Sequence, residues 1–233
     1  MNVAIFVEGL TEEIFVRQLI ENYFGHDIIE IKTQRLIGKR LLYHFDAGKG
    51  ENKCIIINCS NDERTLSCLK DNYLTMYRHG WDIFIGLRDI RPYANISNSE
   101  NMISKTLSYI GEMEKSELIK FHFAKMEIEA WFLVDYKLFK QIDKNLTVEN
   151  ILSTTKADLP NLDPELTFES PASFIKEMYL ELRGKSYQKH EYQIEEIVYN
   201  MDWLYLCFDA QSLGKISFFH SFLSTLTFCM VEN

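Results

Sequence analysis

The chain has 233 residues, of which 46% are hydrophobic, and its 34 acidic residues outnumber its 25 lysines and arginines, giving a formal net charge of −9. This length fits one large domain, or one domain with an appendage. The acidic balance disfavours a protein that grips nucleic acid over its whole surface, because phosphate contacts supply most of that affinity. A nucleic-acid role would need a local basic patch, a bound metal or a partner that brings the substrate.

Nothing in the sequence indicates a membrane segment or an export signal. Met1 and Asn2 lead directly into an apolar segment, without the basic and apolar regions of a signal peptide. The apolar stretch 216–231 is shorter than the roughly 20 residues that span a bilayer, so we expect a buried helix there. The five cysteines are odd in number and form no Cys-x-x-Cys pair, which favours reduced core thiols in a cytoplasmic protein.

Strand-like and helix-like segments alternate through the first half of the chain. In chain order, the expected strands are 3–8, 54–58, 82–88 and 118–124, and the expected helices are about 11–24, 62–78, 98–115 and 127–142. Two further short strands, 28–31 and 41–45, are left open. This order favours a parallel sheet with helices on both faces, which is an α/β, Rossmann-like fold.

The second half lacks strand character. We divide the chain into an α/β domain at 1–143 with a basic insert at 28–53, an irregular connection at 144–170 and an all-helical appendage at 171–233. The connection carries two prolines and many short polar residues, which are typical of turns. Within the appendage, helical spacing indicates helices at 171–184, 190–206 and 212–229.

Two acidic residues follow two of the expected buried strands. Glu8 follows the first strand, and Asp89 follows the strand that ends at about residue 88. The carboxyl ends of parallel strands line the crevice where open α/β sheets bind ligands, so the two side chains should face one another. Carboxylate oxygens are the ligands that Mg²⁺ prefers. The sequence therefore predicts a divalent-cation site at this edge.

A third acidic group opens the expected helix at 127–142. Glu127, Trp131 and Asp135 recur at four-residue spacing and would share one helical face, whereas Glu129 would point elsewhere. These acids could simply stabilise the start of the helix, with Trp131 in the core. Because the helix would start at the same sheet edge as Glu8 and Asp89, one acid could instead complete a metal shell or transfer a proton.

Two features indicate contacts to phosphate. Gly9 and Thr11 form a strand-to-helix junction whose backbone N–H groups could bind an anion, although an ordinary capped loop is the favoured explanation of this motif alone. Between Lys32 and Lys53, basic residues exceed acidic ones, which fits a solvated insert or a phosphate-contact surface. Gly48-Lys49-Gly50 lacks the spacing of a Walker phosphate loop.

Together these motifs resemble the Toprim domain of topoisomerases, primases and the overcoming-lysogenization-defect nucleases. The chain is more closely similar to a bacterial Toprim-like family of unknown function that often occurs beside ATPase genes, including in phage-defence settings. The resemblance rests on Val7-Glu8-Gly9-Leu10-Thr11-Glu12, on Leu87-Arg88-Asp89, on Ala124 to Asp135 with Glu127, Glu129 and Trp131, and more weakly on Tyr187-Gln188-Lys189 and Ser217 to Leu223. One departure is Arg91, which stands where the family has a second aspartate.

The resemblance implies a Mg²⁺- or Mn²⁺-dependent nuclease that acts on DNA or RNA as the effector of an anti-phage system with an ATPase partner. It implies Glu8, Asp89 and Glu127 as metal ligands, and Glu129 as a further catalytic acid or base. Gly9, Thr11, Lys49, Arg88 and Arg91 would contact phosphate. The alternative is a catalytically degenerate Toprim-like binding or regulatory subunit, whose metal site decayed when Arg91 replaced the carboxylate. A homo-oligomer is compatible with either function.

Overall fold

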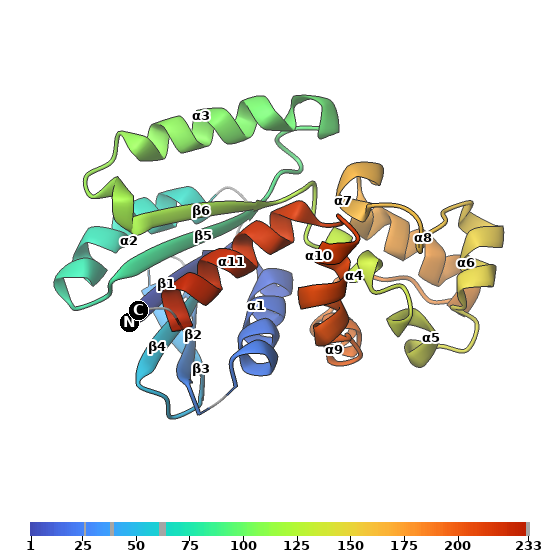
Figure 1. Cartoon of the computed structure of the whole chain (residues 1–233), viewed down its shortest axis with the longest axis horizontal. Coiled ribbons are helices and arrows are strands. Elements are labelled where there is room, and N and C mark those ends of the chain that lie inside the picture. Colours follow the sequence, from blue (N-terminus) through green and yellow to red (C-terminus); the bar gives the residue numbers. More distant parts are fainter. Residues whose placement is uncertain (26, 38–39, 61–63, 232–233) are drawn as a thin grey trace. The chain divides into compact units, whose positions relative to one another are not determined.

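A computed structural model describes residues 1–25, 27–37, 40–60 and 64–231, with the backbone alone at positions 40, 41, 43 and 44. The structure contains a six-stranded sheet in the order β3-β2-β4-β1-β5-β6 (Figure 1). The strands are β1 (Asn2–Val7), β2 (Ile29–Ile37), β3 (Arg40–Ala47), β4 (Asn52–Asn58), β5 (Ile83–Asp89) and β6 (Ile119–Ala124). β1 pairs in parallel with β4 and β5, and β2 pairs in parallel with β4. The expected α/β, Rossmann-like fold with a helical C-terminal part is confirmed.

The sheet is mixed, because the segment expected as a basic insert forms a β-hairpin. β2 and β3 pair antiparallel, from Ile31 opposite Ala47 to Ile37 opposite Arg40. Two strands joined by so few residues can pair only in this way. Burial alternates at the start of β2, where Ile29, Ile31 and Thr33 are buried, whereas β1 is buried without a break from Val3 to Val7. The two open short strands are thus longer than expected, and their hairpin forms one side of the sheet.

The chain forms two compact units, and each is discontinuous in sequence. The first unit contains residues 1–89, 100–123 and 221–233, and the second contains residues 90–99 and 124–220. These units therefore differ from the consecutive segments 1–143, 144–170 and 171–233 that the composition indicates. The polypeptide passes between the units at 89–90, 99–100, 123–124 and 220–221.

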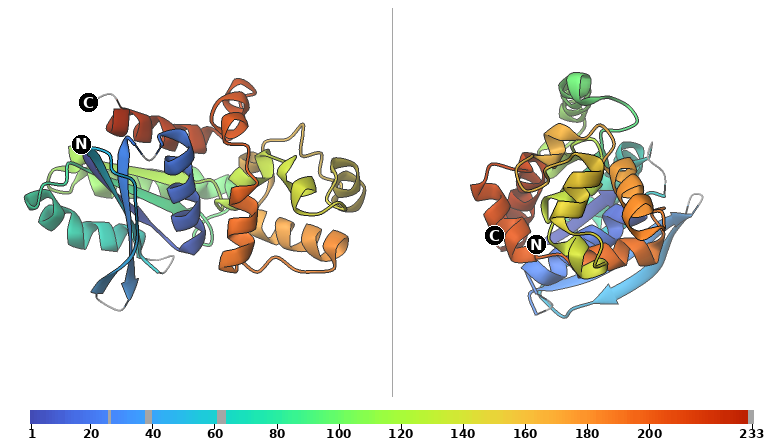
Figure 2. Two further views of the ribbon diagram at one scale, coloured as in Figure 1. Left: turned by 90° about the horizontal axis from the view of Figure 1, so that it is seen from below. Right: turned by 90° about the vertical axis from the view of Figure 1, so that its right-hand side faces the viewer.

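In the first unit, helices cover both faces of the sheet (Figures 1 and 2). α1 (Leu10–Tyr23) connects β1 to β2 in one direction along the sheet, and α2 (Thr65–Arg78) connects β4 to β5 in the other. Because such crossovers are right-handed, the two helices lie on opposite faces. The expected start of α2 near Asp62 lies outside the described residues. α3 (Ser99–Gly111) leads towards β6, and the later part of α11 (Ser217–Val231) packs on β6, where His122 and Phe222 have ring centroids 5.6 Å apart.

The second unit is helical, with α4 (Glu129–Val134), α5 (Leu138–Ile142), α6 (Val148–Thr155), α7 (Pro164–Thr167), α8 (Pro171–Arg183), α9 (Glu191–Tyr199), a π-helical turn at Tyr205–Asp209 and α10 (Ala210–Ser212). The single helix expected at 127–142 is wrong: the chain leaves helical geometry at Asp135, and a new helix begins at Leu138. The stretch 144–170 contains the short helices α6 and α7, which are capped by the side chains of Thr147 and Asp163.

The structure agrees with the sequence on the cysteines and on the apolar stretch 216–231. All five cysteines are free thiols and buried. The apolar stretch lies in α11. Over the described residues, the structure has no helix with the length and apolar character needed to cross a membrane.

Candidate functional site

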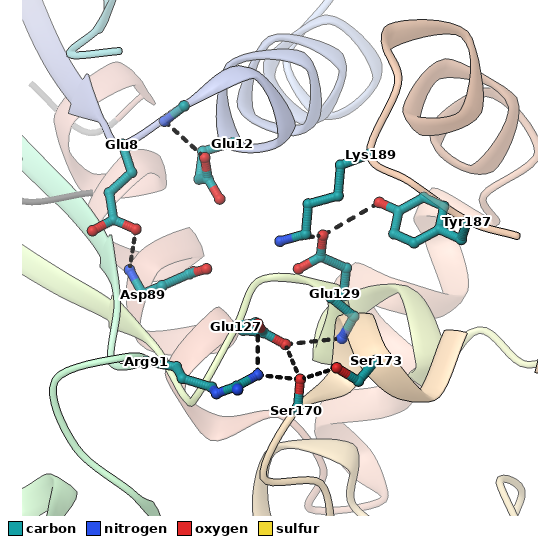
Figure 3. Close-up of polar contacts among 12 residues, drawn as sticks. Glu8, Glu12, Asp89, Arg91, Glu127, Glu129, Ser170, Ser173, Tyr187 and Lys189 are labelled. Atoms are coloured by element: carbon teal, nitrogen blue, oxygen red, sulfur yellow. Dashed lines mark hydrogen bonds and ion pairs between the residues drawn. The ribbon is translucent and has the colours of Figure 1, made fainter. Parts of the chain in front are cut away.

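Glu8 and Asp89 lie side by side at the carboxyl edge of the parallel strands in the first unit. β1 and β5 run in register as far as Val7 and Leu87, and the two acidic residues follow at the strand ends. The backbone N–H of Asp89 donates a hydrogen bond of 3.2 Å to Glu8 Oε2 (Figure 3). Both side chains are buried, with Glu8 4% and Asp89 6% exposed. The sheet therefore brings together two buried acidic residues that are 81 residues apart in the chain, and the backbone of one contacts the carboxylate of the other.

The first turn of α1 adds two buried acids to the same edge. Glu12 and Glu13 are both buried in this turn. Glu12 Oε2 accepts a hydrogen bond of 2.9 Å from the N–H of Gly9 (Figure 3). The Gly9 N–H, which the sequence made a candidate anion donor, therefore already binds a carboxylate of its own chain. Thr11 is buried in the same turn.

Glu13 is held by a guanidinium and an amide from two neighbouring strands. Arg35 of β2 donates from Nε to Oε2 at 2.9 Å and from its terminal nitrogen to Oε1 at 3.1 Å, which is bidentate pairing. Asn58, the last residue of β4, donates to Oε2 at 2.7 Å. Arg35, one of the basic residues between positions 32 and 53, thus has a structural role. Asn58 ends a buried strand, as Glu8 and Asp89 do, so the same strand-end argument would have found it.

Four buried carboxylates gather at this edge, those of Glu8, Glu12, Glu13 and Asp89. Among the described residues, Arg35 pairs with Glu13 and Arg88 with Glu8. Arg88 Nε lies 3.6 Å from Glu8 Oε1, so this side chain neutralises part of the charge. Concentrating anions away from water is unfavourable, and a cation relieves that cost. This edge is therefore suited to attract a cation.

The chemistry of the donors fits Mg²⁺ or Mn²⁺. Carboxylate oxygens coordinate both ions. Mg²⁺ is usually bound by one or two carboxylates, and water or substrate oxygens fill its other coordination positions. The adjacent pair of Glu8 and Asp89 satisfies that requirement. In the part of the chain that the structure describes, no group of three or more His, Cys, Asp or Glu side chains is arranged to hold a metal ion. A cage made of protein ligands alone is thus not present among these residues.

Lys49 is not brought to this site. It lies in the loop between β3 and β4, next to Asn52, which pairs with Ile29 at the start of β2. The amino ends of the parallel strands meet there, whereas Glu8 and Asp89 follow the carboxyl ends. The strand register therefore places Lys49 at the opposite edge of the sheet. Gly50 lies in the same loop. A Cβ at this position would come within 2.0 Å of the Ile28 backbone, so close packing explains why a glycine is found here.

In the second unit, Glu127 caps a helix instead of lying on one. It precedes α4, so the shared helical face proposed for Glu127, Trp131 and Asp135 does not exist. Its Oε2 accepts a hydrogen bond of 2.9 Å from the N–H of Ala172 in the first turn of α8, and another of 3.3 Å from the Ser170 hydroxyl. Arg91 lies 3.4 Å from Glu127 Oε1 and also donates to Ser170 (Figure 3). Among the described residues, Arg91 thus pairs with Glu127 of its own unit.

Glu129 is fully buried at the start of α4 and contacts a cation. Its Oε1 lies 2.9 Å from Lys189 Nζ and accepts a hydrogen bond of 3.2 Å from the Tyr187 hydroxyl (Figure 3). Sequence reasoning noted the Tyr187-Gln188-Lys189 stretch only as part of a resemblance. No local periodicity links it to Glu129, because 58 residues separate Tyr187 from that carboxylate.

Two other buried carboxyls of the second unit have raised pKa values. Burial raises the pKa of Glu165 to about 7, against the opposing effect of hydrogen bonds from the Phe218 N–H and the Trp131 indole. Burial likewise raises the pKa of Asp135 to about 6, although it accepts the N–H of Asp202 at 2.7 Å. Glu165 accepts the N–H groups of Phe218 and Phe219 in the first turn of α11, so it serves as a structural cap.

The raised pKa of Glu165 predicts that stability decreases with pH. The folded chain holds this proton more tightly than the unfolded chain, so the contribution to stability is complete below about pH 4.5 and is lost as the pH rises to about 7. The difference corresponds to about 3 kcal/mol in the free energy of unfolding. Glu165→Gln should flatten the profile measured by thermal unfolding between pH 5 and pH 8. The exposed Glu177→Gln in α8 is the control, and an equal pH slope in both variants would contradict the assignment.

The fold and the acidic edge define a Rossmann-like α/β protein with a buried carboxylate pair at the ends of two parallel strands. The family described as a domain of unknown function, DUF4276, matches residues 7–203, and the chain belongs to this family. The matched stretch includes Glu8, Asp89, Glu127 and Glu129, as well as Tyr187 and Lys189. No curated protein and no solved structure matches the chain.

Proposed function

We propose that this protein is a nuclease that depends on Mg²⁺ or Mn²⁺, with Glu8 and Asp89 as the protein ligands of the cation. The observation that carries the proposal is the burial of these two carboxylates side by side at the carboxyl ends of β1 and β5. The gathering of four buried carboxylates, those of Glu8, Glu12, Glu13 and Asp89, at the same edge supports it. The resemblance to Toprim enzymes supplies the reaction class and the nucleic-acid substrate.

The residues of this edge would have distinct parts in such a reaction. Glu8 and Asp89 would bind the cation, and the Asp89 N–H already orients the Glu8 carboxylate. When bound, the cation supplies Lewis-acid polarisation of a phosphoryl oxygen. Arg88, which is 13% exposed and lies beside Glu8, would donate to a phosphate oxygen from the same edge. Glu13 would keep its structural role, because Arg35 and Asn58 hold both of its oxygens.

The partner belongs to the same proposal. A net charge of −9 fits a nuclease that receives its substrate with the help of another protein. The resemblance to a family found beside ATPase genes supplies the candidate, an ATPase of an anti-phage system.

A second candidate function is a catalytically degenerate binding or regulatory subunit. The ion pair between Arg88 and Glu8 favours it, since a guanidinium already sits 3.6 Å from one of the two ligands. The guanidinium of Arg91, which stands where the Toprim-like family has a second aspartate, favours it as well. Under this alternative the carboxylates serve the fold, and the protein binds no divalent cation at the edge.

Calorimetric titration of EDTA-treated protein with Mg²⁺ and Mn²⁺ separates the two candidates. We expect saturable binding by the wild type, weakened at least about tenfold in Glu8→Gln and Asp89→Asn, because losing even an indirect partner of a metal costs about 10–100-fold in affinity. Asp82→Asn is a matched control: Asp82 accepts the Asn2 N–H at 2.8 Å across β5 and β1, but at the amino edge. Absence of binding by the wild type would reject the nuclease and favour the degenerate subunit.

A further inference from the structure

The second unit contains a surface pocket of about 270 Å³ that the proposed function does not use. It is lined by Ala172, Ser173 and Lys176 of α8, and by Tyr187, Gln188 and Lys189 of the segment that precedes α9. Drug-sized ligands occupy pockets of about 300–1,000 Å³, so this volume suits a small group.

Hydrogen-bond donors dominate the lining of this pocket. Lys176 and Lys189 provide two ammonium groups, Ser173 a hydroxyl and Gln188 an amide. None of the described residues that line the pocket carries a carboxylate. An oxyanion would therefore meet donors and positive charge, whereas a cation would be repelled.

Three polar side chains of this pocket, those of Ser173, Tyr187 and Lys189, are held by contacts within the unit. Lys189 Nζ is held 2.9 Å from Oε1 of the fully buried Glu129, which also accepts the hydroxyl of Tyr187 (Figure 3). Ser173 Oγ lies 2.8 Å from Ser170 Oγ, which in turn contacts Glu127 and Arg91. Side chains already held in place lose little entropy when a ligand binds, which favours affinity.

We propose that this pocket binds the phosphate group of a nucleotide or of a polynucleotide backbone. Two ammonium groups and the Glu129 carboxylate leave a formal charge of +1, which complements the single negative charge of a phosphodiester. Ser173 and Gln188 add neutral donors that fit the remaining phosphate oxygens. The lining of this pocket shares no residue with the cation pair, and the proposal does not depend on cation binding.

The test measures ligand binding in buffer with EDTA, so that the cation pair does not contribute. The probes are adenosine 5′-monophosphate, adenosine and a short fluorescent single-stranded DNA, followed by calorimetry or fluorescence polarisation. We expect binding of at least one phosphate-bearing probe, no binding of adenosine, and affinity that falls as salt is added. Binding of the mononucleotide alone identifies a free nucleotide as the ligand, and binding of the DNA alone identifies a polynucleotide.

Variants locate the binding. Lys176→Gln should weaken binding about tenfold or more, because a hydrogen bond to a charged group contributes about 1.5–3 kcal/mol. Lys185→Gln is the control, since Lys185 is exposed in the same unit but does not line the pocket. A double change, Glu129→Gln with Lys189→Met, avoids leaving a buried charge alone and should also weaken binding. The proposal is overturned if neither phosphate probe binds, if adenosine binds as well as its monophosphate, or if Lys176→Gln behaves like Lys185→Gln.

Discussion

Glu8→Gln should reduce Mg²⁺-dependent cleavage of nucleic acid by about 100-fold or more, while the protein remains folded. The glutamine carbonyl can still accept the Asp89 N–H, which donates to Glu8 at 3.2 Å in the wild type, so the change removes charge and little else. Removing one electrostatic contact at a reacting centre typically costs about 10²–10³ in rate. Initial rates on plasmid DNA, single-stranded DNA and tRNA, with and without the proposed ATPase partner, measure the effect.

Controls make this result specific to the carboxyl edge. Asp89→Asn should show a loss similar to that of Glu8→Gln, whereas Asp82→Asn at the amino edge should cleave at the wild-type rate. Far-ultraviolet circular dichroism and thermal unfolding check that the variants are folded. Equal rates for the wild type and Glu8→Gln, or no cleavage by the wild type under any of these conditions, would remove the nuclease proposal.

Glu13→Ala should destabilise the protein by about 3–5 kcal/mol, since breaking a buried ion pair leaves its partners without compensation. Glu13 is buried and joins α1 to β2 through Arg35 and to β4 through Asn58. For a chain of this size, the loss corresponds to a fall of about 6–20 °C in the midpoint of thermal unfolding. Urea unfolding provides an independent measurement of the free energy.

Glu21→Ala is the matched comparison for this change. Glu21 lies in the same helix, and its contacts to Arg17 at 3.8 Å with i,i+4 spacing and to the Gln18 side chain stay within that helix. Side-chain pairs of this kind within one helix contribute about 0.5 kcal/mol or less each. If Glu13→Ala and Glu21→Ala differ by less than about 1 kcal/mol, the contacts to Arg35 and Asn58 do not have the structural importance given to them here.

The strands and the position of the acidic pair were predictable because local signals determine them. β1, β4 and β5 are short apolar runs that are buried almost throughout, and the edge where parallel strands end follows from their order. The proximity of Glu8 and Asp89 could therefore be predicted from the sequence. The same rule extends to Asn58, which the sequence analysis did not consider.

Other features depend on contacts that no local pattern encodes. The hairpin β2–β3 carries many polar residues, and its register depends on pairing with β4. The break at Asp135 interrupts an apolar run with good helical spacing, and the bond from the Asp202 N–H comes from 67 residues away. Glu127 likewise caps a helix that is distant in sequence, because it accepts a hydrogen bond from the N–H of Ala172. Tertiary contacts of this kind override intrinsic propensity, and they determine which acids cap helices.

The late return of the polypeptide to the first unit has a consequence for biosynthesis. Residues 221–231 of α11 belong with β1, β4 and β5, and Asn52 at the start of β4 donates to the Met230 carbonyl at 3.1 Å. Translation generally lets N-terminal segments fold first. Here one face of the newly made sheet stays partly uncovered until the ribosome has synthesised the second unit and residues 221–231. Stalled or prematurely terminated products would expose apolar surface, and we expect them to engage chaperones or proteases.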